Sequence, residues 1–210
     1  MSQQSESPPS ALTSLGPQTE YSPEERELLL QIAHQSILSF LEGQDISLPA
    51  PAAHLAQPRG VFTTLYSDRR LRGCVGFPTP ILAVYRAVME TARAAACEDP
   101  RFRPISLQET RALQISISVL SPLQTVSPDE IEIGRHGLVI SRGAQRGLLL
   151  PQVPAEHGWD RITFLEQTCL KAGLSPDAWL SGAHIDAFTA EVFADPGCAA
   201  SSSRTDAEGT

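Results

Sequence analysis

Large apolar residues recur at helical spacing in the first clear segment of the chain. Between residues 29 and 41 they lie three or four positions apart, which is typical of an amphipathic helix. The preceding Ser22–Glu25 segment has the residue order of a capping box, in which Ser22 caps the helix and Glu25 reaches back to it. Gly43 is the kind of residue that commonly ends a helix. We therefore predict one helix between this cap and Gly43.

Other segments alternate apolar and polar residues, or are rich in β-branched residues, as strands are. Strands are expected at 60–66, 71–77, 115–120, 136–141, 147–150 and 185–193. Two more helices are expected, one capped by Thr79-Pro80 and one over 161–172. Strands that arrive as hairpins, with helices inserted between them, favour an α+β fold with a mostly antiparallel sheet.

The two ends of the chain differ in composition from the rest. The 210 residues fit one domain with tails. Residues 1–20 and 196–210 are mostly small or polar and contain few large apolar groups. Such segments cannot bury enough apolar surface to offset the entropy of ordering, so we predict two disordered tails around a domain over 21–195.

Charge and cysteine usage exclude several classes of protein. The net charge is −8, and the sixteen basic residues form no cluster, which argues against a nucleic-acid partner. No secretory signal and no apolar run of membrane length is present, so a cytoplasmic protein with no membrane partner is expected. The four cysteines form no CxxC pair and should be reduced. Arginine in place of lysine, with abundant Ala and Pro, indicates a GC-rich bacterial genome.

Three segments together resemble a known family. They are Leu71–Gly76, which reads LRGCVG; Asp99–Phe102, which reads DPRF; and the stretch from 136 to 173, which contains HGL, LLPQV and KAG. Their order and spacing are similar to the AMMECR domain family (AmmeMemoRadiSam system protein A) over residues 21–195. The resemblance implies an α+β fold, with a mostly antiparallel central sheet flanked by helices and a smaller subdomain across a cleft.

The same resemblance implies partners. Bacterial and archaeal members of the family are associated with a Memo-like protein and a radical S-adenosylmethionine protein. The resemblance implies that the cysteine of the RGCxG segment lies near the cleft. It supplies no established reaction, so it identifies no cofactor and leaves open whether the chain is an enzyme.

Cys74 is the main candidate for chemistry. Gly73 and Gly76 flank it, and glycines let another backbone or a ligand approach closely. A helix is expected soon after it, and a nearby helix N-terminus favours a thiolate. Cys74 is thus a candidate nucleophile or redox-sensitive thiol, with His136 as its general base. The alternatives are a small buried cysteine in a tight hairpin and a histidine bonded to backbone.

Three further residues are candidates for binding a ligand. Arg72 and Arg101 could hold an anion through their planar guanidinium groups, and Gln152 could bond a ligand through its amide. The alternatives are an ion pair of Arg72 with Asp99 or another acid, and a purely local role of Arg101 in its loop. No metal site is predicted, because the His and Cys residues lack ligand spacing.

Three hypotheses about function follow from the sequence. In the first, the chain is a binding component that acts with the Memo-like and radical partners through a cleft near Cys74. In the second, it is a cysteine-dependent enzyme that uses Cys74. In the third, it is a scaffold whose groove receives a partner's strand or terminus.

Overall fold

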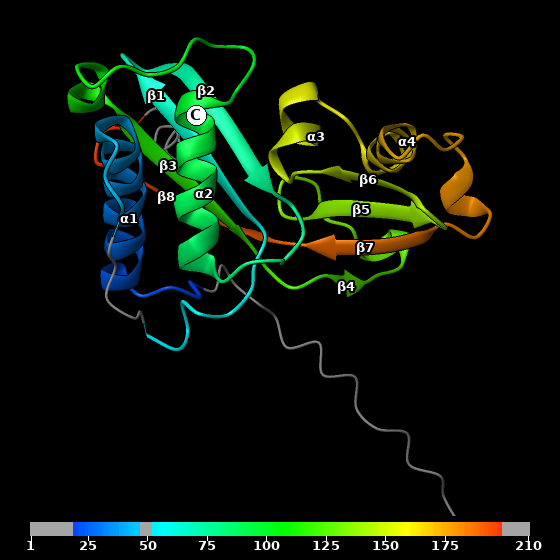
Figure 1. Ribbon diagram of the computed structural model, residues 1–210. Coiled ribbons are helices and arrows are strands. Elements are labelled where there is room, and N and C mark those ends of the chain that lie inside the picture. Colours follow the sequence, from blue (N-terminus) through cyan, green and yellow to red (C-terminus); the bar gives the residue numbers. More distant parts are fainter. Residues whose placement is uncertain (1–18, 47–51, 199–210) are drawn as a thin grey trace, which may run out of the picture.

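The protein folds into two antiparallel four-stranded sheets that lie side by side (Figure 1). This computed structural model describes residues 19–46 and 52–198, so most of the two predicted tails lies outside the described residues. The strand order is β2-β1-β3-β8 in the first sheet and β4-β7-β5-β6 in the second. The predicted α+β class with antiparallel pairing is therefore confirmed, although the strands form two sheets where one central sheet was expected.

The helices and strands alternate along the chain without a regular repeat. In order they are α1 (Pro23–Glu42), β1 (Val61–Ser67), β2 (Arg70–Phe77), α2 (Val84–Cys97), η1 (Glu109–Ala112), β3 (Gln114–Leu120), β4 (Gln124–Thr125), η2 (Pro128–Glu130), β5 (Gly137–Arg142), β6 (Gln145–Leu149), α3 (Gln152–His157), α4 (Arg161–Lys171), η3 (Ala178–Leu180), β7 (His184–Phe188) and β8 (Ala190–Ala194). Within the described ranges, no helix has the length and apolarity needed to cross a bilayer.

The capping box at the start of α1 is confirmed. The Glu25 N–H donates to the Ser22 hydroxyl (3.2 Å), and the Glu25 carboxylate accepts the Ser22 N–H (2.9 Å). Gly43 ends the helix in a left-handed conformation (φ 68°). These local contacts satisfy orphan main-chain groups at both ends, which is why the sequence alone predicted the helix correctly.

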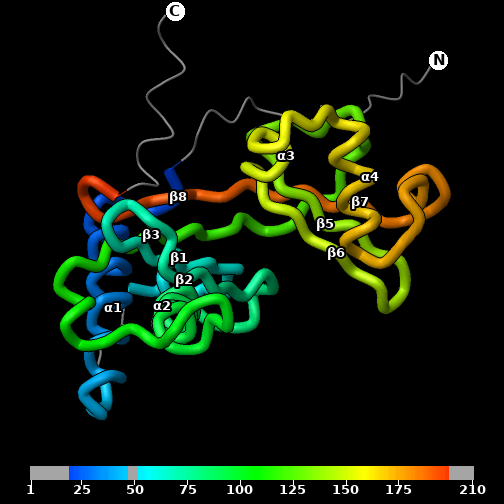
Figure 2. The backbone as a smooth tube through the Cα atoms, turned by 90° about the horizontal axis from the view of Figure 1, so that it is seen from above, coloured from blue at the N-terminus to red at the C-terminus, as the bar shows by residue number. Residues whose placement is uncertain are grey.

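The first sheet presents two different faces. Odd-numbered residues of its central strands, such as Leu65 and Ile117, are fully buried against α1 and α2. Figure 2 shows both helices on this side of the strands. A buried hydrogen bond between the Thr63 and Thr91 hydroxyls (2.7 Å) also joins β1 to α2. Even-numbered residues point to the other face, where Thr64 and Tyr66 of β1 are partly buried and Ser116 of β3 is buried.

Gly73 sets how closely α2 approaches β2. A Cβ atom at this position would lie 2.1 Å from the carbonyl oxygen of Ala95 in α2. Only glycine fits such a contact between two backbones. The short side chains of Ala92, Ala95 and Ala96 line the same helix and are buried, so small residues on both elements allow the close packing.

Two chain crossings connect the sheets, and they are bonded to each other. One leaves β3 at Ser121 and the other joins β7 to β8 at Thr189. The Ser121 N–H donates to the Thr189 carbonyl (2.9 Å), and the Thr189 N–H donates to the Ser121 hydroxyl (3.0 Å). Leu120, Val139 and Phe188 form an apolar cluster between the sheets. The crossings and the cluster therefore hold the sheets together.

Several element boundaries differ from those expected. The single strand predicted over 185–193 is two strands in different sheets, because the chain crosses between sheets at Thr189. The second helix begins at Val84 with no side-chain cap, and not at Thr79-Pro80. Ala83, which directly precedes the helix, forms an isolated β-bridge with Pro58. Helix α3 was not predicted.

The close contact at Gly73 yields a prediction about stability. Replacing Gly73 by Ala should force α2 away from β2 and lower the free energy of unfolding by about 2–3 kcal/mol, the upper range for overpacking. The measurement is urea unfolding. Cys74→Ala is the matched control, because the Cys74 side chain faces away from α2. Equal midpoints for Gly73→Ala and the wild type would show that α2 does not need this glycine.

Candidate functional site

Cys74 lies in the middle of β2, at the edge of the first sheet. Its side chain is half-buried and lies on the face opposite α1 and α2. The Thr64 hydroxyl, directly across from it on β1, donates a hydrogen bond to Sγ (3.2 Å). The expected helix N-terminus is not beside the thiol. The helix end near it is the C-terminal end of α2, which contacts Gly73 through Ala95.

Two side chains from the Asp99–Phe102 segment bind the main chain of Cys74. The Cys74 N–H donates to Asp99 Oδ2 (2.8 Å), and Arg101 Nη2 donates to the Cys74 carbonyl oxygen (3.3 Å). Asp99 and Arg101 also form an ion pair (2.7 Å). Both main-chain groups of Cys74 point outward from the edge strand. Asp99 and Arg101 therefore make the hydrogen bonds that a neighbouring strand would make. We call this arrangement the Asp99–Arg101 clamp.

The two residues of the clamp differ strongly in their exposure to solvent. Only 5% of Asp99 is exposed, whereas 56% of the Arg101 side chain is exposed. Hydrogen bonds from the Arg101 guanidinium, and then from the N–H groups of Cys74 and Arg101, hold the pKa of the Asp99 carboxyl well below its usual range. Asp99 is therefore charged at neutral pH, and the exposed side of Arg101 is accessible from solvent.

Arg72 pairs with an acid, which is one of the two alternatives raised by the sequence. Its Nε donates to Glu109 Oε1 (3.2 Å), so the partner is Glu109 and not Asp99. Hydrogen bonds from the N–H and hydroxyl of Ser106, and from Arg72, lower the pKa of Glu109 to about 2. Arg72 lies where the β1–β2 register shifts, and this irregularity turns its side chain toward the 98–112 loop.

Hydroxyl groups surround the thiol on the partly exposed face of the first sheet. Thr64 and Ser116 lie in the same row across the sheet as Cys74, and Tyr66 lies further along β1. Burial raises the pKa of the Tyr66 hydroxyl, and the nearby Cys198, Cys74 and Glu156 raise it further. Glu156 belongs to α3, so α3 lies within electrostatic reach of this face. We call it the hydroxyl face.

His136 lies just before β5 and bonds to the main chain of the segment that precedes it. Its Nδ1 accepts the Glu132 N–H (3.1 Å), and burial lowers the pKa of the imidazole. This matches the alternative of a histidine bonded to backbone. The hydrogen-bond partner of the Cys74 sulfur is Thr64, so the pairing of Cys74 with His136 as general base stays a prediction.

The remaining candidates are an exposed glutamine and a glycine whose free space is filled by protein. Gln152 begins α3 and its side chain is exposed, so its amide is open to solvent and needs no buried partner. At Gly76 a Cβ atom would lie 2.1 Å from the ring of Phe62. Thus α2 fills the space at Gly73 and Phe62 fills the space at Gly76, and at both positions the close approach comes from the protein itself.

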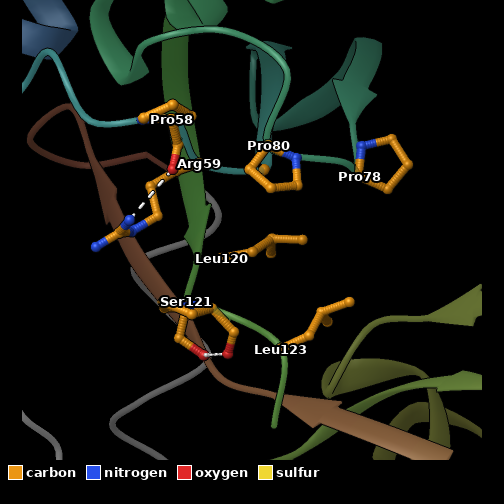
Figure 3. A pocket seen from close by; sticks show the side chains of 9 residues that line it. Pro58, Arg59, Pro78, Pro80, Leu120, Ser121 and Leu123 are labelled. Atoms are coloured by element: carbon orange, nitrogen blue, oxygen red, sulfur yellow. Dashed lines mark hydrogen bonds between the residues drawn. The ribbon is translucent and has the colours of Figure 1, made fainter.

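Two cavities in the described structure lie away from Cys74. A small one of about 80 Å³ lies between the sheets, among Pro58, Pro78, Pro80, Leu120 and Leu123 (Figure 3). A larger groove of about 520 Å³ runs between α1 and β8. Cys74 lines neither of these cavities, so the cleft expected beside it stays a prediction. Among the residues with described positions, no group of three His, Cys, Asp or Glu residues is arranged to hold a metal ion.

Sequence reasoning missed Thr64 and underestimated Asp99. Thr64 looked like an ordinary β-branched strand residue, and its contact with Cys74 depends on the register of the hairpin. Asp99 was considered as a partner of Arg72, whereas it accepts hydrogen bonds from the N–H groups of Arg101 (3.1 Å) and Cys74. A hairpin register counted from the Asp68-Arg69 turn would pair Thr64 with Gly73, because it misses the register shift between Leu65 and Tyr66 that places Thr64 opposite Cys74.

The charge of Asp99 yields a prediction about acid stability. Asp99→Asn should lower the free energy of unfolding at pH 7 by about 2–3 kcal/mol, because hydrogen bonds to a buried charge are lost. A lowered folded-state pKa stabilises the fold above the unfolded value, about 3.9 for Asp, and this contribution is lost as pH falls. The difference between wild type and variant should therefore shrink below about pH 4. A difference that stays constant from pH 7 to pH 2 would contradict the assignment.

Comparisons with known proteins identify the family of this chain. Residues 30–193 match the AMMECR1 family model. Protein MK0488 of Methanopyrus kandleri is 49% identical over 182 residues, which cover 81% of this chain and 88% of that protein. Protein MJ0810 of Methanocaldococcus jannaschii is 41% identical, with coverage of 81% and 90%. The crystal structure of the uncharacterized protein PH0010 from Pyrococcus horikoshii superposes with a TM-score of 0.70 and 41% identity over 81% of this chain and 91% of that one. The chain therefore belongs to the AMMECR1 family.

Proposed function

We propose that the protein is a binding component that acts with a Memo-like protein and a radical S-adenosylmethionine protein in the bacterial cytoplasm. The binding surface is the hydroxyl face around Cys74, together with the exposed side of Arg101. The partners come from the family resemblance. The location is the one expected for a chain whose four cysteines form no CxxC pair.

One observation carries the proposal: hydrogen bonds fix the position of Cys74, although this residue is partly exposed. The Asp99–Arg101 clamp fixes both main-chain groups of Cys74, and Thr64 fixes its sulfur. A small polar surface held in this way can bind a ligand or a partner segment with little loss of conformational entropy. Thr64 and Tyr66 are partly exposed there. The Tyr66 hydroxyl can donate and accept hydrogen bonds, and the Thr64 hydroxyl, which donates to Sγ, can accept one.

Catalysis receives less support from the same contacts. A nucleophilic cysteine needs a base or a cation that activates the sulfur, with a third group that orients the base. The hydrogen bond that reaches the Cys74 sulfur comes from a hydroxyl, and the Arg101 guanidinium is bound to main chain and carboxylate. One contact still favours the enzyme alternative, because a hydroxyl that donates to sulfur stabilises negative charge on it.

The proposal predicts a difference between two substitutions at one position. Cys74→Ala should keep binding to the Memo-like and radical partners, because it removes the thiol and leaves the surface in place. Cys74→Arg should weaken binding by roughly tenfold or more, because a charged, bulky side chain then stands in the interface. Binding is measured by titration of each purified partner into the full chain.

The control is Leu170→Arg, which adds the same charge at an exposed position on α4, a helix that packs against the second sheet. It should bind as the wild type does. The proposal is wrong if Cys74→Arg also binds like the wild type while remaining folded by circular dichroism.

The enzyme alternative makes its own prediction about the thiol. A catalytic Cys74 should be alkylated by iodoacetamide several-fold faster in the folded chain than in the urea-unfolded chain. A packed or binding residue should be alkylated more slowly when folded. Mass spectrometry of the peptide that contains Cys74 separates it from Cys97, which is also partly exposed. Slower reaction in the folded state would end the enzyme alternative and leave the binding proposal unaffected.

A further inference from the structure

The outer edge of β8 carries main-chain groups that pair with no other strand in the described residues. β8 is an end strand of the first sheet, and β3 lies on its other side. The Asp195 N–H donates to the Ile115 carbonyl (2.9 Å), in register with this ladder. Along an antiparallel strand, the main-chain groups of successive residues point alternately to one side and the other. The N–H and C=O groups of the odd-numbered β8 residues therefore point toward β3. Val192 and Ala194 therefore direct their N–H and C=O groups outward.

The opposite edge of the same sheet is closed. There, on β2, the Asp99–Arg101 clamp binds the outward N–H and C=O of Cys74. Proteins close sheet edges in such ways because an open edge pairs with other chains. The sequence of β8 (AEVFA) contains no Lys or Pro, and its register with β3 has no bulge. The β8 edge is therefore suited to pairing with a further strand.

A groove of about 520 Å³ runs along this edge. Its floor includes Phe193 and Ala194, and one side of α1 forms its wall. Two ion pairs fix the helix beside the strand, because Arg26 binds Glu191 (2.8 Å) and His34 binds Asp195 (2.8 Å). Helix and strand thus run in the same direction, and the groove follows both.

The wall of the groove is self-complementary. Along α1, Glu27, Leu30, Gln31 and His34 follow one another at helical spacing and line the groove. An acidic residue lies at one end of this row, an imidazole at the other, and an apolar residue between them. A second copy that runs antiparallel would place each Glu27 near the other copy's His34, with the two Leu30 side chains at the centre.

We propose that the β8 edge is the interface of a homodimer. Two β8 strands pair antiparallel through the main-chain groups of Val192 and Ala194, which joins two first sheets into one continuous sheet. The α1 helices of the two copies then face each other through Glu27, Leu30 and His34. Such an interface uses the same surface on both copies, as two-fold symmetric dimers do.

The first test measures the molar mass of the full chain and of two variants at one position. The wild type should be a dimer by light scattering and sedimentation. Val192→Pro removes only an outward N–H, which edge strands tolerate, and should raise the dimer dissociation constant roughly tenfold or more. Val192→Ala shortens the same side chain, keeps the N–H and should remain a dimer. A wild-type monomer at up to ~100 µM would overturn the proposal.

The second test does not depend on a proline variant folding. Hydrogen exchange of the Val192 and Ala194 amides should be slow in the dimer and should speed up on dilution. Glu27→Arg should weaken the dimer several-fold, whereas Glu42→Arg, at the end of α1 outside the groove, should not. Amides that stay protected in a monomer would mean that another segment of the chain covers the edge, and that result would also overturn the proposal.

Discussion

The arrangement around Cys74 depends on the Asp99–Arg101 clamp at the edge of the first sheet. An edge strand exposes main-chain groups, and two side chains satisfy those of Cys74. Gly73 makes the clamp possible, because it lets the end of α2 lie against β2. Asp99 follows α2 by only two residues, so the packing of the helix brings the carboxylate to the Cys74 N–H. One glycine contact thus connects the core to the candidate site.

The two faces of the first sheet have different physical roles. The face toward α1 and α2 is apolar, and full burial of each large aliphatic side chain there contributes about 1.5–3 kcal/mol to stability. The hydroxyl face combines the partly exposed Thr64, Tyr66 and Cys74 with the buried Ser116. A rigid apolar layer beneath it holds these groups in place, which is what a binding surface requires.

Local chemistry made some elements predictable and left others hidden. The capping box of α1 and the hairpin of β1 and β2 are encoded within a few residues, and both were predicted. The alternation over 185–193 continues through Thr189, so it gives no sign that the chain changes sheets there. Helix α3 has six residues and contains Pro154, which leaves too short a periodic pattern to recognise.

The candidate site was predictable in its residues more than in its contacts. The glycines around Cys74 indicated a close approach, but sequence could not say that α2 and Phe62 make it. The acid that pairs with Arg72 lies 37 positions away, and the clamp joins Cys74 to a residue 25 positions away. Such partners are set by tertiary packing, which sequence spacing does not encode.

The most direct measurement is hydrogen exchange at the Cys74 amide in the wild type and in Asp99→Ala. If the clamp holds this main chain, exchange should be slow in the wild type and at least about tenfold faster in the variant. The amide of Ile117, in the centre of the sheet, should remain far better protected than the Cys74 amide in the variant, because it is released only by global unfolding. Equal exchange at Cys74 in the two proteins would show that Asp99 does not hold the strand and would contradict the account.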